Sequence, residues 1–128
     1  MSGGSGRDLL IGGLDSDSLD GGASDDILIG GTTTHDANDV ALGLIMAEWS
    51  SARTYRARVN NLKGISRGNP HFNNRLNGSA FLINRSSAPT VFNDNSKDSL
   101  TGSTGMDWFM LDHVLDDLVD REAFEEWK

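Results

Sequence analysis

The residues best suited to do chemistry in this chain are aspartates that recur at a fixed spacing among glycines. Asp8, Asp17 and Asp26 follow one another in steps of nine residues. Each is the sixth residue of a nonamer that begins with two glycines and has leucine at its eighth position. Aspartate carboxylates are hard anionic oxygen ligands, which Ca²⁺ prefers. The spacing therefore indicates cation binding, which explains the carboxylates more simply than acid–base catalysis does.

The nonamers run back to back and fit the pattern G-G-x-G-x-D-x-U-x, in which U is a large apolar residue. Paired glycines let the backbone turn tightly with positive φ, and such a turn aims carbonyl oxygens inward. Asp15 and Ser24 replace the glycine of the fourth position, and both residue types tolerate turns. A fourth copy begins at Gly30 and places His35 where aspartate is expected. The three copies read GGSGRDLLI (3–11), GGLDSDSLD (12–20) and GGASDDILI (21–29).

The nine-residue period returns in the second half of the chain. The sixth positions of the returning copies include Asp98 and Asp107, and the best match is GSTGMDWFM, residues 102–110. We therefore expect a first repeat block over 3–31 and a second, degenerate block over 76–119. A cap or tail would follow over 120–128. The apolar positions reached from Leu28 in steps of nine are Leu82, Val91, Leu100, Phe109 and Leu118.

Between the two blocks, residues 36–63 are predicted to form one amphipathic helix. Apolar residues recur at spacings of three and four, as on one face of a helix, and include Ile45 and Trp49. Asn38 is one of the candidate N-caps, and Gly64 is suited to the position after the last turn. We interpret the apolar stripe as a contact with the core and not as a binding groove.

Composition favours one domain, 1–128, with a thin core. The chain is 37% hydrophobic and holds 15 glycines. It has no cysteine, which excludes disulfides and thiolate metal sites and suits a secreted protein that uses metal instead. No apolar run is long enough to span a bilayer, so we expect no membrane insertion. Because the repeats begin at once, we also expect this chain to be part of a longer repeat protein.

Charge is unevenly distributed along the sequence. The net charge is −8, yet residues 49–93 hold seven bases and no acid. An acidic surface argues against a nucleic acid as the partner of the whole chain. The basic segment, 53–85, has two interpretations. It docks against the acidic ends of its own chain, or it binds an anionic glycan or surface polymer.

The nonamers resemble the RTX, or haemolysin-type, calcium-binding repeats of bacterial secreted proteins. The stretches DANDVALGLIMAEWSSARTYRARVNNL, LNGSAFLIN and DSLTGSTGMDWF resemble a C-terminal module of large planctomycete-type secreted or surface proteins. The resemblance implies a mainly β fold, a right-handed parallel β-roll (RTX-type solenoid). One amphipathic helix would interrupt it, and an acidic C-terminal segment would cap it.

The resemblance also implies where Ca²⁺ would bind, which is between successive loops on the same edge. Asp8 and Asp26 would share one edge. Asp17 would face the other edge, where its partner position is His35. Asp98 and Asp107 resemble ligands of a second cluster. Backbone carbonyls would complete the first site near Gly3, Ser5, Gly22 and Ser24.

The function expected from these features is that of a calcium-binding, calcium-folded structural module. It would lie at the C-terminus of a secreted or cell-surface bacterial protein and aid type I secretion and extracellular folding. The sequence has no HEXXH, G-x-S-x-G or P-loop signature, so we expect no enzyme and no catalytic residues. The alternative is an adhesion module that uses segment 53–85. Self-association through open roll ends also stays open.

Overall fold

The computed structural model of this chain describes residues 1–84, 86–110 and 117–120. They belong to two compact units, which we call the repeat unit and the helical unit. The repeat unit comprises Met1–Thr33 and Phe92–Lys128, and the helical unit comprises Thr34–Val91. In sequence, the helical unit is thus inserted between the two segments of the repeat unit.

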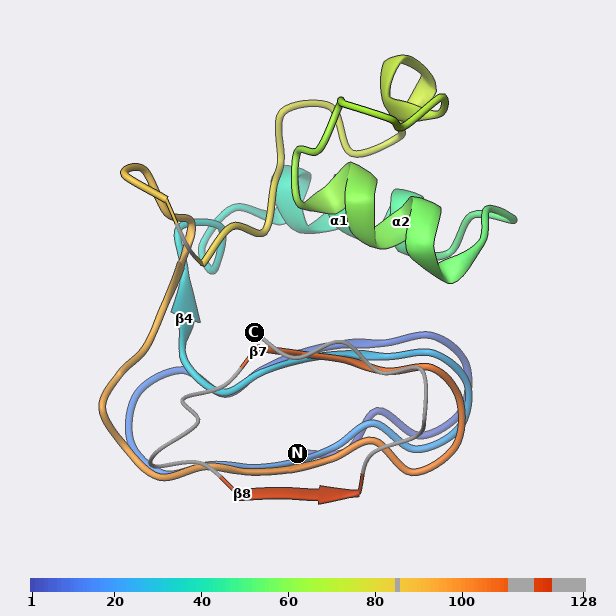
Figure 1. Ribbon diagram of the computed structural model, residues 1–128. Coiled ribbons are helices and arrows are strands. Elements are labelled where there is room, and N and C mark those ends of the chain that lie inside the picture. The colour runs from blue at the N-terminus through green and yellow to red at the C-terminus, as the bar shows by residue number, and fades with distance from the viewer. Residues whose placement is uncertain (85, 111–116, 121–128) are drawn as a thin grey trace. The chain divides into compact units, whose positions relative to one another are not determined.

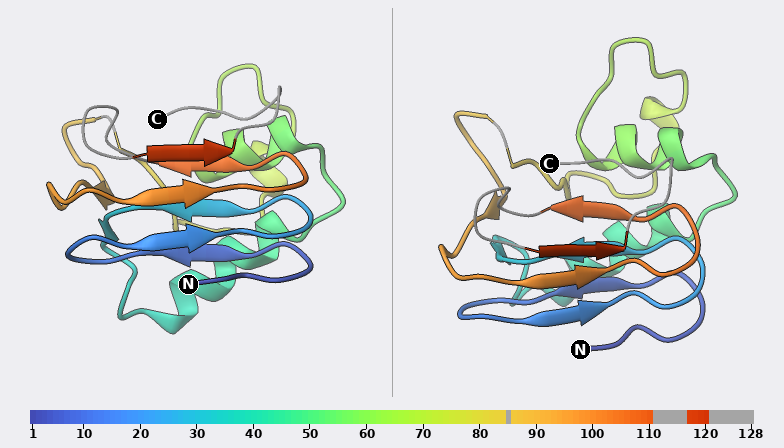
Figure 2. Two further views of the ribbon diagram at one scale, coloured as in Figure 1. Left: turned by 90° about the horizontal axis from the view of Figure 1, so that it is seen from below. Right: turned by 60° about the horizontal axis from the view of Figure 1, so that its bottom comes forward.

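Two three-stranded parallel sheets form the repeat unit (Figure 1), and Figure 2 shows its short strands lying side by side. One sheet has the order β1-β3-β7 and the other has the order β2-β6-β8. Each sheet therefore combines strands from both sides of the insertion. The bounds are Leu9–Ile11 for β1, Ser18–Asp20 for β2, Ile27–Ile29 for β3, Ser99–Thr101 for β6, Trp108–Met110 for β7 and Asp117–Asp120 for β8.

The strands pair in the register of the nonamers, with eighth positions opposite one another. Leu10 is opposite Leu28, which is opposite Phe109 in turn. In the other sheet Leu19 is opposite Leu100. These five side chains form one buried apolar cluster with members from both sheets. The predicted apolar register is confirmed at these positions, where each three-residue strand supplies one side chain to the cluster.

The predicted fold class, a mainly β right-handed parallel β-roll, is wrong. The described residues form two α-helices and a set of short strands, and these strands lie in small separate sheets that close no roll or solenoid. The predicted copies around Leu82 and Val91 add no strand to the two three-stranded sheets. Leu82 is instead buried in the helical unit, where its amide donates to the Leu62 carbonyl at 2.8 Å. Strand β5, Val91–Phe92, forms a two-stranded sheet with β4, Thr32–Thr33.

The single helix predicted over 36–63 is also wrong, because the chain breaks there into α1, Asp39–Trp49, and α2, Tyr55–Leu62. A second cap explains the break. Asn38 caps α1 by accepting from the Ala41 amide at 3.1 Å, as predicted, and the Thr54 hydroxyl caps α2 by accepting from the Ala57 amide at 3.2 Å. Farther along, Phe72–Asn74 form a short 3₁₀ helix.

Most of the apolar stripe of the two helices is buried, as predicted, and it forms the core of the helical unit. The side chains of Ile45, Trp49, Val59 and Leu62 are all buried. Trp49 lies edge-on to Tyr55, with ring centroids 5.9 Å apart. The helical unit therefore has apolar and aromatic contacts of its own.

Candidate cation site

The repeat aspartates form two rows, each tied together by hydrogen bonds from backbone to carboxylate. In the first row the Asp8 amide donates to Oδ1 of Asp26, and the Asp26 amide donates to Oδ1 of Asp107, both at 2.8 Å. In the second row the Asp17 amide donates to Oδ1 of Asp98 at 2.8 Å. Each bond joins equivalent positions of neighbouring loops, so it fixes one oxygen of the accepting carboxylate.

These rows differ from the predicted clusters. Asp107 joins the row of Asp8 and Asp26, and the partner of Asp17 is Asp98 instead of His35. His35 belongs to the helical unit, where its Nε2 lies 2.9 Å from the Phe81 carbonyl oxygen. Asp98 follows His35 by seven nonamers. The insertion therefore preserves the nine-residue register, and for this reason counting in steps of nine reached the correct aspartates.

The loops that carry the aspartates share a backbone conformation. The second and fourth positions have positive φ in four nonamers, which aligns the loops for stacking. Parallel bridges join Ser5 to Ala23 and Ala23 to Thr104 across three of these loops. Non-glycine residues take this conformation at Asp15, Ser24 and Ser103. The φ values are 96°, 99°, 95° and 68° at Gly4, Gly13, Gly22 and Ser103, and 93°, 71°, 84° and 118° at Gly6, Asp15, Ser24 and Gly105.

In each of the first three nonamers, the first glycine makes room for the aspartate of the same nonamer. A Cβ on Gly21 would lie 2.5 Å from Oδ2 of Asp26, closer than real contacts allow. Sequence reasoning singled out Gly3 but missed Gly12 and Gly21, although glycine at the first position of the first three nonamers was a signal. The equivalent distances are 2.6 Å from Gly3 to Asp8 and 2.9 Å from Gly12 to Asp17.

The second carboxylate oxygen, Oδ2, of Asp8, Asp17 and Asp26 is buried and accepts no hydrogen bond. The Asp26 side chain as a whole has no exposed surface. A buried carboxylate oxygen without a donor carries a large desolvation cost, which a cation or a proton can offset. The loops thus hold oxygen atoms that need a positive partner.

The pKa of Asp26 also indicates a carboxylate that needs a positive partner. Burial, the largest influence, raises the pKa of its carboxyl to about 7, whereas the hydrogen bond from the Asp8 amide lowers it. Repulsion from Asp107, Asp8 and Asp25 raises this pKa further. Without a cation, neutral solution therefore leaves a large share of Asp26 carboxyls protonated.

Backbone carbonyls would have to complete a site for Ca²⁺. Within the described ranges, no three His, Cys, Asp or Glu side chains converge as a metal cluster. Two oxygen atoms border the space beside Gly3. The point that a Cβ on Gly3 would occupy lies 2.6 Å from Oδ2 of Asp8 and 2.7 Å from the Gly21 carbonyl oxygen. The carbonyl of Gly22, a predicted ligand, accepts from the Thr104 amide at 3.1 Å. Carboxylates from neighbouring loops with adjacent carbonyls fit the oxygen preference of Ca²⁺.

Several bases of segment 53–85 have structural contacts within the helical unit. Arg53 pairs with the buried Glu48 at 3.0 Å. Arg58 is itself buried, donates to the Trp49 carbonyl at 3.2 Å and stacks over the Trp49 ring at 4.5 Å. Arg56 and Arg67 are exposed.

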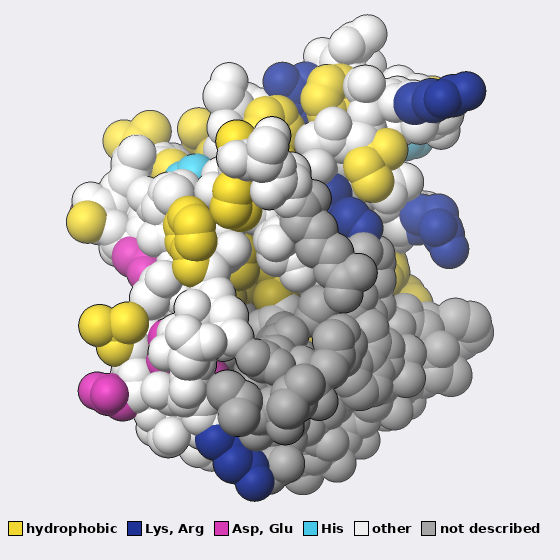
Figure 3. All heavy atoms as spheres, turned by 60° about the vertical axis from the view of Figure 1, so that its left-hand side comes forward, with side chains coloured by type: hydrophobic (Ala, Val, Ile, Leu, Met, Phe, Trp, Pro, Cys, Tyr) yellow, Lys and Arg dark blue, Asp and Glu magenta, His cyan; other side chains and the backbone are white. Residues whose placement is uncertain are grey.

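On the face in Figure 3, Lys and Arg side chains stand in separate groups and not in one continuous patch. Arg85 lies outside the described residues.

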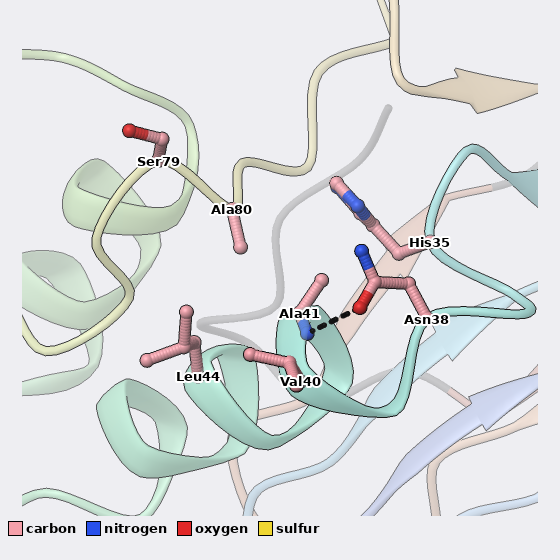
Figure 4. A pocket seen from close by; sticks show the side chains of 7 residues that line it. All are labelled: His35, Asn38, Val40, Ala41, Leu44, Ser79 and Ala80. Atoms are coloured by element: carbon pink, nitrogen blue, oxygen red, sulfur yellow. Dashed lines mark hydrogen bonds between the residues drawn. The ribbon is translucent and has the colours of Figure 1, made fainter.

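A shallow hollow in the helical unit offers no comparable chemistry. Its volume is about 260 Å³, and it opens widely to solvent. Figure 4 shows the Asn38 side chain turned to the Ala41 amide, so this amide group serves as a helix cap. None of the described residues that line the hollow carries a carboxylate, so these residues do not suit a cation. The lining residues are His35, Asn38, Val40, Ala41, Leu44, Ser79 and Ala80.

No protein-family model matches the chain, and neither a curated protein sequence nor a solved structure matches it. Across the described part of the chain, every helix is too short or too polar to cross a bilayer. The geometry of the aspartate rows is therefore the main guide to the function of this chain.

Proposed function

We propose that the aspartate rows bind Ca²⁺ and that this chain is a non-enzymatic module stabilised by that binding. The observation that carries the proposal is the set of buried Oδ2 atoms of Asp8, Asp17 and Asp26, none of which accepts a hydrogen bond. The ligands would be the carboxylates of Asp8, Asp17, Asp26, Asp98 and Asp107 with carbonyls of the glycine loops. Bound Ca²⁺ would supply the positive charge that these oxygens need.

The mechanism is electrostatic. In the first row, Asp8 and Asp107 both raise the pKa of Asp26 by repulsion. A divalent cation offsets this repulsion, so part of its binding free energy becomes free energy of folding. Extracellular calcium modules bind with Kd values of about 10⁻⁴–10⁻³ M. Such an affinity leaves the module without Ca²⁺ in a calcium-poor cytoplasm, whereas millimolar Ca²⁺ outside the cell fills about half of its sites or more.

The resemblance to RTX repeats supports the same proposal and extends it to location. The module would belong to a secreted or cell-surface bacterial protein, where Ca²⁺ helps it fold after type I secretion. The alternative, adhesion to an anionic glycan, has less support because Arg53 and Arg58 already serve internal contacts. It would depend on exposed bases such as Arg56 and Arg67.

Thermal unfolding followed by circular dichroism tests the proposal. We expect the melting temperature to rise when chelator is replaced by millimolar Ca²⁺. Mg²⁺ should substitute poorly, because it requires tight octahedral geometry and gives up water reluctantly. Identical melting curves in chelator and in Ca²⁺ would overturn the proposal.

A further inference from the structure

The first aspartate row joins two segments that are far apart in sequence. The bond from the Asp26 amide to Oδ1 of Asp107 spans 81 residues, and the Trp108 amide donates to the Asp26 carbonyl at 2.8 Å beside it. The bond from Asp8 to Asp26 spans only 18 residues. Docking the loop of Asp107 on that of Asp26 therefore requires closure of a much longer stretch of chain, most of which is the helical unit.

The helical unit brings its own two ends together. The Thr34 amide donates to the Thr90 carbonyl at 2.8 Å, and these residues are the first and next-to-last of the unit. The Thr90 hydroxyl also donates to the Phe81 carbonyl at 2.6 Å and accepts from the Ile83 amide at 2.9 Å. We call the Thr34–Thr90 pair the neck.

We propose that the folded helical unit acts as a chain clamp, which holds the neck closed and thereby raises the calcium affinity of the Asp26–Asp107 pair. This inference rests on the proposed function, because it takes Ca²⁺ as the ligand of that pair. The clamp works through chain connectivity. When the neck is open, forming the Asp26–Asp107 contact closes a flexible loop of 81 residues. When the neck is closed, only about two dozen residues of this loop, those outside the helical unit, remain flexible.

The helical unit should fold without Ca²⁺, because its described core is built from residues of the unit itself. Trp49, Val59 and Leu62 fill its core, and the buried Arg58 binds the Trp49 carbonyl at the end of α1. Glu48 accepts from the Leu76 amide at 2.8 Å and pairs with Arg53, so this buried charge is also satisfied. Ca²⁺ would then act on a chain whose insertion is already ordered.

Loop-closure entropy gives the size of the effect. Closing 81 residues instead of about two dozen lowers the closure probability roughly sixfold. A variant that unfolds the helical unit should therefore raise the Ca²⁺ midpoint of the Asp26–Asp107 contact roughly sixfold. The contact between Asp8 and Asp26, which encloses none of the insertion, should keep its midpoint.

Hydrogen exchange followed by mass spectrometry on the full chain, during a Ca²⁺ titration, can separate these events by segment. We expect protection of β7, Trp108–Met110, to rise with Ca²⁺, while α2 is protected even in chelator. Leu62→Ala removes a fully buried side chain of the helical unit and should shift the β7 midpoint upward. Val40→Ala, at a side chain that is 75% exposed in the same unit, is the control and should leave the midpoint unchanged.

An engineered disulfide across the neck should replace the clamp. The chain has no cysteine of its own, so the two new cysteines have no other partner within it. In the Leu62→Ala background, Thr34→Cys with Thr90→Cys should return the β7 midpoint to its original value when oxidised and lose this effect when reduced. If Ca²⁺ never protects β7, the proposed function fails. If Ca²⁺ protects β7 but Leu62→Ala, shown to expose α2, leaves the midpoint in place, the chain clamp is wrong and calcium binding stands.

Discussion

The backbone amide of Asp26 donates to Oδ1 of Asp107 at 2.8 Å, across 81 residues of sequence. The two residues hold the same position in nonamers that lie on opposite sides of the helical unit. Their bond continues the row that begins at Asp8. A row of like charges held this way is unfavourable by itself, and this property can be tested in several ways.

Replacing Asp26 with asparagine should separate stability from calcium binding. Asp26→Asn retains an oxygen that can accept from the Asp8 amide but removes a buried charge. We expect the free energy of unfolding in chelator to rise, on the order of 1–3 kcal/mol, because the raised pKa reports a charge that costs free energy to bury. Calcium affinity should fall at the same time. Denaturant titrations with and without Ca²⁺ measure both effects.

Asp15→Asn is the matched control for that variant, because it removes the same charge from an exposed side chain of a neighbouring loop. Asparagine tolerates the positive φ of 71° at this position. Unfolding in chelator should change by less than about 0.5 kcal/mol. Equal effects of the two substitutions would show that burial of Asp26 is not the source of its cost.

The stability of the calcium-free protein should decrease as pH rises. The Asp26 carboxyl has a pKa of 3.8 in a model peptide and about 7 in the folded chain, chiefly because of burial. Between these values the folded state binds more protons than the unfolded state. Protonated Asp26 therefore makes its full contribution to the free energy of unfolding below pH 4, and this contribution is lost as pH rises through 7. Melting temperatures at pH 5 and pH 8 in calcium-free buffer should show this decrease, and Asp26→Asn should reduce it.

Alanine at the first glycine of a nonamer should disrupt a site, whereas alanine in the helix should not. A Cβ at Gly21 would lie 2.5 Å from Oδ2 of Asp26 and would have to displace that oxygen. We expect Gly21→Ala to weaken calcium binding at least tenfold, which corresponds to about 1.4 kcal/mol. Gly43→Ala in α1 meets no atom within 4 Å and should stabilise the helix by up to about 1 kcal/mol. Calorimetry on both variants provides the comparison, and equal calcium affinities would contradict the assigned role of Gly21.

Arg58 should matter for folding and Arg56 should not. The buried Arg58 guanidinium contacts the Trp49 ring and carbonyl, so Arg58→Ala removes packing and leaves that carbonyl without this donor. A loss of about 2–4 kcal/mol in the helical unit is expected. Arg56→Ala, at an exposed side chain, should stay within about 0.5 kcal/mol. Exchange protection of α2 reports the difference, and a harmless Arg58→Ala would contradict a structural role for this base.

The aspartate rows were largely predictable because a short period fixes them. Each nonamer carries its own turn glycines, carboxylate and apolar side chain, so local sequence determines the position of Asp8, Asp17 and Asp26. Counting in steps of nine also reached Asp98 and Asp107, because the insertion keeps the register. The choice of partner was not predictable. The sequence placed His35 opposite Asp17, and only the fold shows that the chain leaves at Thr34 and that Asp98 takes that place.

The fold class was wrong because periodicity alone does not identify strands. Leu82 lies in the nine-residue register, yet its amide binds the Leu62 carbonyl at the end of α2. Tertiary contacts with the helices determine the conformation at Leu82, and a nine-residue period in the sequence cannot predict such contacts. In the same way, the apolar spacing over 36–63 did not reveal the break between α1 and α2. Thr54, whose hydroxyl caps α2, was the signal that could have located it.

Isothermal titration calorimetry of Ca²⁺ into the full chain, previously stripped of metal, shows whether the aspartate rows bind this cation. We expect saturable binding with a Kd of about 10⁻⁴–10⁻³ M, and weaker or absent binding in Asp26→Asn. We also expect proton release near pH 7, because a cation at Asp26 displaces the proton that its raised pKa retains. Two results would contradict the account: no saturable heat at millimolar Ca²⁺, or binding that Asp26→Asn and Gly21→Ala leave unchanged.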